Sequence, residues 1–315
     1  MKRIRVIRGW NDLQAVDRGA SVAMGSFDGV HLGHQQVIAL AANAARELDA
    51  PLGVITFDPH PRVFFRPDEP AFHLMQPDQQ ARALEKLGVD MLYVLPLDAE
   101  LAGMSDREFA ALVLHDGIGA RHVSVGFDNS FGKGRTGTPD TMAAYGLEMG
   151  FGVSVAAPFG DETGDKFSST AVRDALRDGK PEVAAEILGR PFAIEGPVQR
   201  GRQLGRTLGF PTANVALADY VTPRFGVYAT RTRLSDGREL AGVANIGINP
   251  TVHGITAPLL EVWLFDFDED IYDRIIETDL IAFLRPEEKF DSLAIMTTQV
   301  MADAKQARAL LGTGP

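Results

Sequence analysis

The order of predicted secondary structure changes once along the chain, and this change constrains the fold more than any other feature. Up to about residue 185, short apolar runs alternate with helix-like segments, as at 21–27 and in the alanine-rich stretch that follows. Such alternation predicts helices around a parallel, doubly wound sheet. After about residue 190, strand-like segments such as 226–234 and 239–248 follow one another without helices. That order predicts a mainly antiparallel β-barrel domain.

The length of 315 residues favours two domains, and we place them at 1–185 and 186–315. The short segment 179–192 is expected to join them. Within the first domain, a helix over 105–117 is expected to begin at a capping Ser105 and to end at Gly117. Apolar residues at helical spacing predict a closing helix near the C-terminus, between Asp291 and Leu311.

Composition excludes several classes of protein. The formal net charge is −11, which argues against nucleic acid as a partner, because that affinity depends on neutralising phosphates. No apolar run approaches the roughly 18 residues of a membrane span. The chain contains no cysteine, so disulfides and thiolate chemistry are excluded and the reducing cytoplasm is the expected compartment. The sequence leaves open whether copies of the chain form a homo-oligomer.

A glycine-rich motif, GSFDGVHLGH at 25–34, follows the first strand and opens the first long helix. Its glycines allow the backbone to approach a ligand, and a helix N-terminus offers amides to an anion. His31 and His34 lie three residues apart and therefore share one face of a helical turn. Two imidazoles in this position suit the binding of phosphate oxygens and nucleotidyl transfer.

Three further segments follow strands in the same half of the chain: TFDPHP at 56–61, GFDNSFGKGRTG at 126–137 and SSTAVR at 168–173. Each segment alone is weak evidence for a functional site, since prolines, loop cations and capping serines are common in turns. Their shared place at the strand-to-helix edge, where parallel sheets bind ligands, favours a common site.

The second half contains the most specific run, GRQLGRTLGFPTAN at 201–214. Thr212 and Asn214 are two apart on an extended segment, so their side chains point the same way. Their oxygens suit Mg²⁺ bound alongside ATP. Glu261 interrupts an apolar strand, and a carboxylate there suits a general base for phosphoryl transfer. Neither a P-loop nor the protein-kinase motifs occur, so a kinase of another kind is expected.

The order of these motifs resembles that of bacterial bifunctional riboflavin kinase/FAD synthetases, whose first half is similar to the wider HxGH nucleotidyltransferases. The resemblance extends through GVYA at 226–229, GVANIGINPT at 242–251 and LRPEEKF at 284–290. It implies an enzyme that phosphorylates riboflavin to FMN and adenylylates FMN to FAD, with ATP and Mg²⁺.

The resemblance also implies roles for individual residues. It makes His31 and His34 catalytic in the first half and Glu261 catalytic in the second. It assigns Mg²⁺ to Thr212 and Asn214. It assigns ATP binding to Gly25, Phe27, Asp28, Gly33, Ser168, Thr170, Arg173, Gly201, Arg206, Gly209 and Pro211. It assigns flavin binding to Asp128, Arg135, Tyr228 and Asn245.

The segment at 126–137 departs from the family pattern, because Asn129 and Ser130 stand where an aromatic residue and usually a cation or threonine follow the acid or amide. This departure leaves open a riboflavin kinase with impaired or lost FMN adenylylation. Two further alternatives are a non-catalytic flavin-binding regulator and nucleotidyl transfer to a different phosphorylated substrate.

Overall fold

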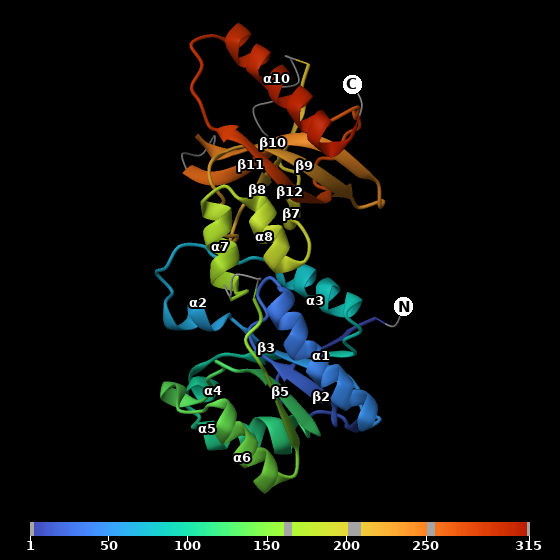
Figure 1. The fold of residues 1–315 in the computed structure, drawn as a ribbon, viewed down its shortest axis with the longest axis vertical. Coiled ribbons are helices and arrows are strands. Elements are labelled where there is room, and N and C mark those ends of the chain that lie inside the picture. The colour runs from blue at the N-terminus through green and yellow to red at the C-terminus, as the bar shows by residue number, and fades with distance from the viewer. Residues whose placement is uncertain (1–2, 161–165, 201–208, 251–255, 314–315) are drawn as a thin grey trace. The chain divides into compact units, whose positions relative to one another are not determined.

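The computed structural model describes residues 3–160, 166–200, 209–250 and 256–313 (Figure 1). Close contacts between Cα atoms divide the chain into two units. The first comprises Met1–Glu69 and Pro77–Phe167, and the second comprises Pro70–Gln76 and Ser168–Pro315. The domain limits at 1–185 and 186–315 remain a prediction, because a division by contacts does not test where each activity ends.

The first unit contains the predicted parallel sheet. Its strands are β1 (Arg5–Arg8), β2 (Ser21–Met24), β3 (Leu52–Asp58), β4 (Met91–Pro96), β5 (His122–Gly126) and β6 (Gly152–Ala156). They lie in the order β1-β4-β3-β2-β5-β6, and every pairing is parallel. Strand β1 was not predicted, because its short run carries an arginine at each end.

The strand order reverses between β2 and β5, since the chain adds β3 and β4 on one side of β2 and β5 and β6 on the other. Ligands of doubly wound sheets bind at such a reversal, outside the carboxyl ends of the strands. The motif at 25–34 follows β2 and the segment at 126–137 follows β5. The topology therefore places the two loops at neighbouring strand ends.

The helices of the first unit mostly follow the predicted pattern. They are α1 (Leu32–Glu47), α2 (Pro61–Phe65), α3 (Pro77–Lys86), α4 (Ala99–Gly103), α5 (Asp106–Glu108), a π-helix (Phe109–Ile118) and α6 (Pro139–Met149). Ser105 caps α5 through a reciprocal pair with Glu108, as its position predicted. The predicted end at Gly117 is wrong. The chain continues as a π-helix, and Gly119, with φ 62°, supplies the left-handed cap.

The second unit contains the predicted antiparallel barrel. Its strands are β7 (Phe192–Pro197), β8 (Thr212–Ala216), β9 (Gly226–Leu234), β10 (Glu239–Pro250), β11 (Thr256–Leu264) and β12 (Ile275–Pro286). They lie in the order β7-β12-β9-β10-β11-β8 with every pairing antiparallel. Beyond β7, the Gln199 amide donates to the Asn214 carbonyl of β8 at 2.8 Å, so the two edge strands meet and the sheet curls toward closure.

In the described part of the second unit, three helices accompany this sheet: α7 (Ser169–Arg177), α8 (Pro181–Leu188) and α10 (Leu293–Leu311). Helix α10 packs on β9, β10 and β12, as the upper part of Figure 1 shows. Helix α8 lies inside the segment expected to be a simple connection. Its first residue is Pro181, whose missing N–H costs nothing at that position, and Gly189 ends it with φ 72°. None of the described helices is long and apolar enough to cross a lipid bilayer.

His122, the first residue of β5, is buried. Its Nδ1 is 3.1 Å from Ser21 Oγ, and its Nε2 is 2.9 Å from Ser154 Oγ. Because the Ser21 hydroxyl donates to the Ala41 carbonyl at 2.8 Å, it accepts from Nδ1–H of His122. Burial lowers the pKa of His122, and the charge of Glu47 only partly opposes this effect.

The lowered pKa predicts an acid-sensitive contribution to stability. The neutral His122 stabilises the folded state fully above the ordinary histidine pKa of 6.5, and this contribution is lost as the pH falls through the lower folded pKa. Urea unfolding at pH 8 and pH 5 should therefore show a larger drop in free energy of unfolding for the wild type than for His122→Gln. The exposed His115 supplies the control, since His115→Gln should retain the wild-type drop. An equal drop in the free energy of unfolding in His122→Gln and wild type would contradict the stabilising role of neutral His122.

Candidate active sites

The loop after β2 holds an unusual backbone conformation. Phe27 has φ 51°, Gly29 has φ 85° and Val30 has φ 43°. Positive φ is rare for a β-branched residue and costs roughly 1–3 kcal/mol, so the surrounding structure must hold the loop in place. Phe27, Asp28 and Val30 are all buried.

Side chains from outside the motif hold this loop. Gln80 Nε2 donates to the carbonyls of Ser26 and Phe27 at 3.0 and 3.1 Å, and the Thr56 hydroxyl donates to the Ser26 carbonyl at 3.1 Å. Gly25 N donates to the Ile55 carbonyl of β3 at 3.2 Å. Gln80 was not predicted from the sequence, because it lies on α3 and no local pattern links it to the loop.

The two histidines are in contact. His31 caps α1: its Nδ1 accepts from the His34 backbone amide at 3.2 Å. The proton of the neutral ring therefore lies on Nε2. The two rings stack with centroids 3.6 Å apart, and Phe27 meets the His34 ring edge-on at 5.1 Å. The structure thus brings Phe27, His31 and His34 together at the N-terminus of the helix.

Gly33 lies against this pair. A Cβ at Gly33 would lie 3.2 Å from Cε1 and Nδ1 of His31 and from the Phe167 carbonyl oxygen. This spacing is tight, so any larger residue must displace the imidazole or the backbone. Glycine at this position therefore maintains the stacked arrangement.

The loop after β5 is anchored by Phe131, which is buried and pairs with Gly137 through backbone hydrogen bonds. Arg135 is exposed and donates from Nε to Ser130 Oγ at 2.8 Å. Ser130, one of the two departures from the family pattern, thus holds the guanidinium predicted to bind flavin.

Asp128, also in this loop, forms an ion pair with Lys166. The Lys166 ammonium lies 4.7 Å from the centre of the exposed Phe127 ring. Sequence reasoning missed Lys166, because a single lysine in a polar stretch carries no pattern. The loop therefore presents an acid, a cation and an aromatic ring together.

Helix α7 carries the third segment, and its residues lie in different environments. Ser168 caps the helix by accepting from the Ala171 amide at 3.1 Å, and Thr170 is exposed. Arg173 is buried: its Nε donates to the Phe72 carbonyl at 2.8 Å, and its guanidinium lies 5.1 Å from the centre of the Phe72 ring. These contacts support a structural role for Arg173 within the second unit, and its predicted role in ATP binding stays a prediction.

The second candidate site forms across three adjacent strands. Asn214 of β8 pairs directly with Glu261 of β11, and Glu261 pairs with Asn245 of β10. Directly paired residues in antiparallel strands have side chains on the same face, with Cβ atoms roughly 4.5–5.5 Å apart. Thr212 is two residues from Asn214 and shares this face. The structure therefore brings together four of the residues predicted from the sequence.

Asn214 carries an observation that bears on a metal ion. Its side chain is buried, and Oδ1 makes no hydrogen bond to any residue that the structure describes. Leaving such an oxygen unmatched costs about 1–3 kcal/mol, so a binding partner is expected there. A hard oxygen beside the Thr212 hydroxyl fits Mg²⁺ held jointly with ATP phosphates.

The remaining predicted residues of the second half are not all at this site. Tyr228 is fully buried, and its hydroxyl donates to the Arg224 carbonyl at 2.5 Å. Since Val227 pairs with Asn245, the neighbouring Tyr228 side chain lies on the opposite face of the sheet. Gly209, with φ 89°, and Pro211 lead into β8. Gly201 and Arg206 lie outside the described residues.

Comparison with known proteins agrees with this architecture. A family model described as FAD synthetase matches residues 13–171, and one described as riboflavin kinase matches 188–311. Two curated relatives bear the name bifunctional riboflavin kinase/FMN adenylyltransferase. The one from Pseudomonas fluorescens is 41% identical and the one from Escherichia coli K12 is 38% identical, each over 98% of both chains. A crystal structure described as a macrolide-efflux protein from Streptococcus pneumoniae is 32% identical, covers 97% of this chain and 99% of its own, and has a TM-score of 0.86.

The fold and the matched regions define a class of transferase that joins a nucleotidyltransferase-like α/β domain to a kinase barrel. The chain belongs to the bifunctional riboflavin kinase/FMN adenylyltransferase family. The resemblance seen in the sequence and the expected fold class are both confirmed.

The burial of Arg173 predicts a loss of stability on substitution. Arg173→Lys removes the planar donor group and leaves the Phe72 carbonyl without its partner, which should lower the free energy of unfolding by about 1–3 kcal/mol. Urea unfolding of wild type and variant measures this difference. Arg177, exposed on the same helix, supplies the control: Arg177→Lys should change stability by no more than about 0.5 kcal/mol. Wild-type stability in Arg173→Lys would contradict the structural role.

Proposed function

We propose that this chain phosphorylates riboflavin to FMN and then adenylylates FMN to FAD, using ATP in both reactions. The observation that carries the proposal is the placement of Glu261 directly opposite Asn214, whose buried oxygen has no partner among the described residues. A general base and a metal-binding oxygen thus share one face of the barrel. The complete absence of cysteine supports the cytoplasm as the compartment.

In the kinase reaction, Glu261 accepts the proton of the terminal ribityl hydroxyl as its oxygen attacks the γ-phosphorus of ATP. The bond from the γ-phosphorus to the bridging oxygen breaks, and ADP leaves. Thr212 and Asn214 would hold Mg²⁺, which neutralises charge on the phosphate oxygens when bound. The half-buried position of Glu261 keeps its carboxylate in reach of a substrate at the sheet face.

In the adenylylation, a phosphate oxygen of FMN attacks the α-phosphorus of ATP and pyrophosphate leaves. His31 and His34 stabilise the charge that develops on the phosphate oxygens, and the amides at the start of α1 add partial positive charge. The cap hydrogen bond fixes the His31 ring and the His34 ring stacks on it, so little reorganisation is needed during the reaction. The loop that contains Asp128 would also supply a cation near the flavin phosphate, the guanidinium of Arg135.

A product time course from riboflavin, ATP and Mg²⁺ tests the proposal directly. Wild-type protein should form FMN first and FAD after it, resolved by chromatography. Accumulation of FMN without FAD, also when FMN is supplied, would support the alternative kinase with lost adenylylation. Tight flavin binding without any product would support the non-catalytic regulator and overturn the proposal.

Substitution of the proposed base should separate the two reactions. Glu261→Gln keeps the size of the side chain and removes the base, so FMN formation should fall by roughly 10²–10⁴-fold, while adenylylation of supplied FMN is retained. His34→Ala should have the reverse effect, with a loss of about 10²–10³-fold in FAD formation. Loss of both activities in either variant would show that the assignment of residues to separate reactions is wrong.

The tight space at Gly33 predicts a specific defect in the first reaction. Gly33→Ala should displace the His31 ring and lower the rate of FMN adenylylation about tenfold or more, since small misplacements of catalytic groups are costly. The rate of FMN formation should stay at the wild-type value. Gly103→Ala is the matched control, because a Cβ at Gly103 meets no atom within 4 Å. Wild-type adenylylation by Gly33→Ala would refute the role given to this spacing.

A further inference from the structure

The row of paired residues that contains the kinase site continues across the sheet. Asn245 of β10 pairs with Val227 of β9, and Val227 pairs with Arg285 of β12. Although the register of β12 shifts between Phe283 and Arg285, the Arg285 side chain contacts Asp303 of α10, the helix that packs against Val227, and therefore lies on the same sheet face as Glu261. Helix α10 covers part of this face, because Val227, together with residues of α10, belongs to one apolar cluster.

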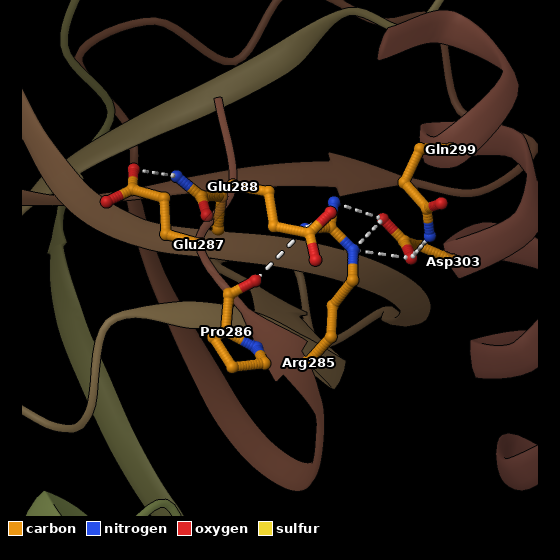
Figure 2. Close-up of polar contacts among 7 residues, drawn as sticks. Arg285, Pro286, Glu287, Glu288, Gln299 and Asp303 are labelled. Atoms are coloured by element: carbon orange, nitrogen blue, oxygen red, sulfur yellow. Dashed lines mark hydrogen bonds and ion pairs between the residues drawn. The ribbon is translucent and has the colours of Figure 1, made fainter. Parts of the chain in front are cut away.

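Arg285 forms a largely buried ion pair with Asp303 of α10 (Figure 2). Its Nη2 lies 2.8 Å from Asp303 Oδ2, and its Nε lies 3.0 Å from Oδ1. Gln299 Nε2 also donates to Oδ1, at 2.9 Å. Asp303 is only 4% exposed, and a buried carboxylate is tolerated only when it is well paired. The pair therefore joins β12 to α10 in one defined geometry.

This ion pair fixes how the chain leaves β12. Arg285 Nη1 donates to the Pro286 carbonyl at 3.0 Å, and Pro286 is the last paired residue of the strand, opposite Gly226. Gly226 has φ 148°, and a Cβ there would lie 2.3 Å from the Arg285 carbonyl oxygen. The backbone at the end of β12 is thus held by the Arg285 side chain and by close contact with Gly226. The next residue along the chain is Glu287.

Glu287 lies beside the kinase site. Its carboxylate is labelled in Figure 2. The Oε1 atom accepts from Asn245 Nδ2 at 3.4 Å, and Asn245 is the direct neighbour of Glu261 in the ladder. Gly247 makes room for the carboxylate, because a Cβ there would lie 2.3 Å from Glu287 Oε1. It is the neighbouring Glu288, rather than Glu287, that approaches Arg285, at 3.9 Å. The exposed Glu287 carboxylate is therefore available to hydrogen-bond donors at the edge of the site.

We propose that Glu287 contacts the alcohol substrate of the kinase reaction and that the Arg285–Asp303 pair is its positioning device. Glu287 accepts hydrogen bonds from the hydroxyl groups of a polyol chain, and the Asn245 amide donates to their oxygens, so that the terminal hydroxyl is held at Glu261. Arg285 and Asp303 do not touch substrate and act only through the end of β12. This inference rests on the proposed function and adds a substrate-binding residue that sequence reasoning did not identify.

Steady-state kinetics of FMN formation in the full-length chain test the inference. Glu287→Gln should raise the KM for riboflavin about tenfold or more, as expected for a lost hydrogen bond to a charged group, with the KM for ATP unchanged. Glu288→Gln is the matched control, and its KM values should equal those of the wild type. Equal riboflavin KM in Glu287→Gln and wild type overturns the inference.

The positioning role has its own test. Asp303→Asn should raise the riboflavin KM in the same way, and the double variant Asp303→Asn/Glu287→Gln should be no worse than the poorer single variant, because both changes remove one interaction. Multiplied effects in the double variant would show that Asp303 acts on its own and would overturn the positioning role.

Gly247→Ala provides a second route that leaves the ion pair intact, in case Asp303→Asn folds poorly. The added methyl group should displace the Glu287 carboxylate and raise the riboflavin KM, and FMN adenylylation should stay unchanged. An unchanged riboflavin KM in Gly247→Ala counts against the inference. A wild-type protein that forms no FMN would instead overturn the proposed function itself, so the two failures are distinguishable.

Discussion

The strand register of the barrel is the constraint on which the second site depends. Backbone hydrogen bonding between β8, β11 and β10 places Asn214, Glu261 and Asn245 side by side, although they are far apart in the sequence. A shift of one residue in any of these pairings would turn the shifted side chain to the other face of the sheet. Because the opposite face is filled by buried residues such as Tyr228 and Ile246, burial and register enforce each other. Packing on the opposite face of the sheet therefore keeps the three polar side chains in their relative positions.

The first site depends on a different kind of constraint. Its loop adopts backbone angles that are unfavourable for Phe27 and Val30, and the carbonyls that it exposes are held by Gln80 and Thr56. The stacked histidines are then fixed by a helix cap. The two sites thus show two ways of holding polar groups in place, one through a regular ladder and one through a strained turn supported by neighbouring side chains.

Local patterns predicted much of this structure, and long-range contacts account for what they missed. Alternating segments predicted the parallel sheet, and the cap at Ser105 marked the start of a helix correctly. The end of that helix was misplaced, because a π-helix extends it beyond the first glycine. Helix α8 was not predicted. Its eight residues follow shortly after α7 and begin with proline, and this short segment was interpreted as a connection between the domains.

The same limit applies to the sites. Spacing along β8 predicted that Thr212 and Asn214 share one face, and an acid in an apolar strand singled out Glu261, whose role as a base stays a prediction. Spacing alone gave no pairing between strands, so the placement of Tyr228 on the far face and the proximity of Glu287 to Asn245 needed coordinates.

The short segment Pro70–Gln76 prevents the two units of this enzyme from being separated at a single point of the chain. It belongs to the second unit by its contacts, yet both of its flanks belong to the first. His73 hydrogen-bonds through its backbone to Asp219 and Val221, and Phe72 supplies the acceptor for buried Arg173. The polypeptide therefore crosses between the units three times, and no single cut yields two complete pieces. A fragment begun at Ser168 would lack the segment that contacts Asp219, Val221 and Arg173, so separating the second unit intact would require rejoining the chain around Pro70–Gln76.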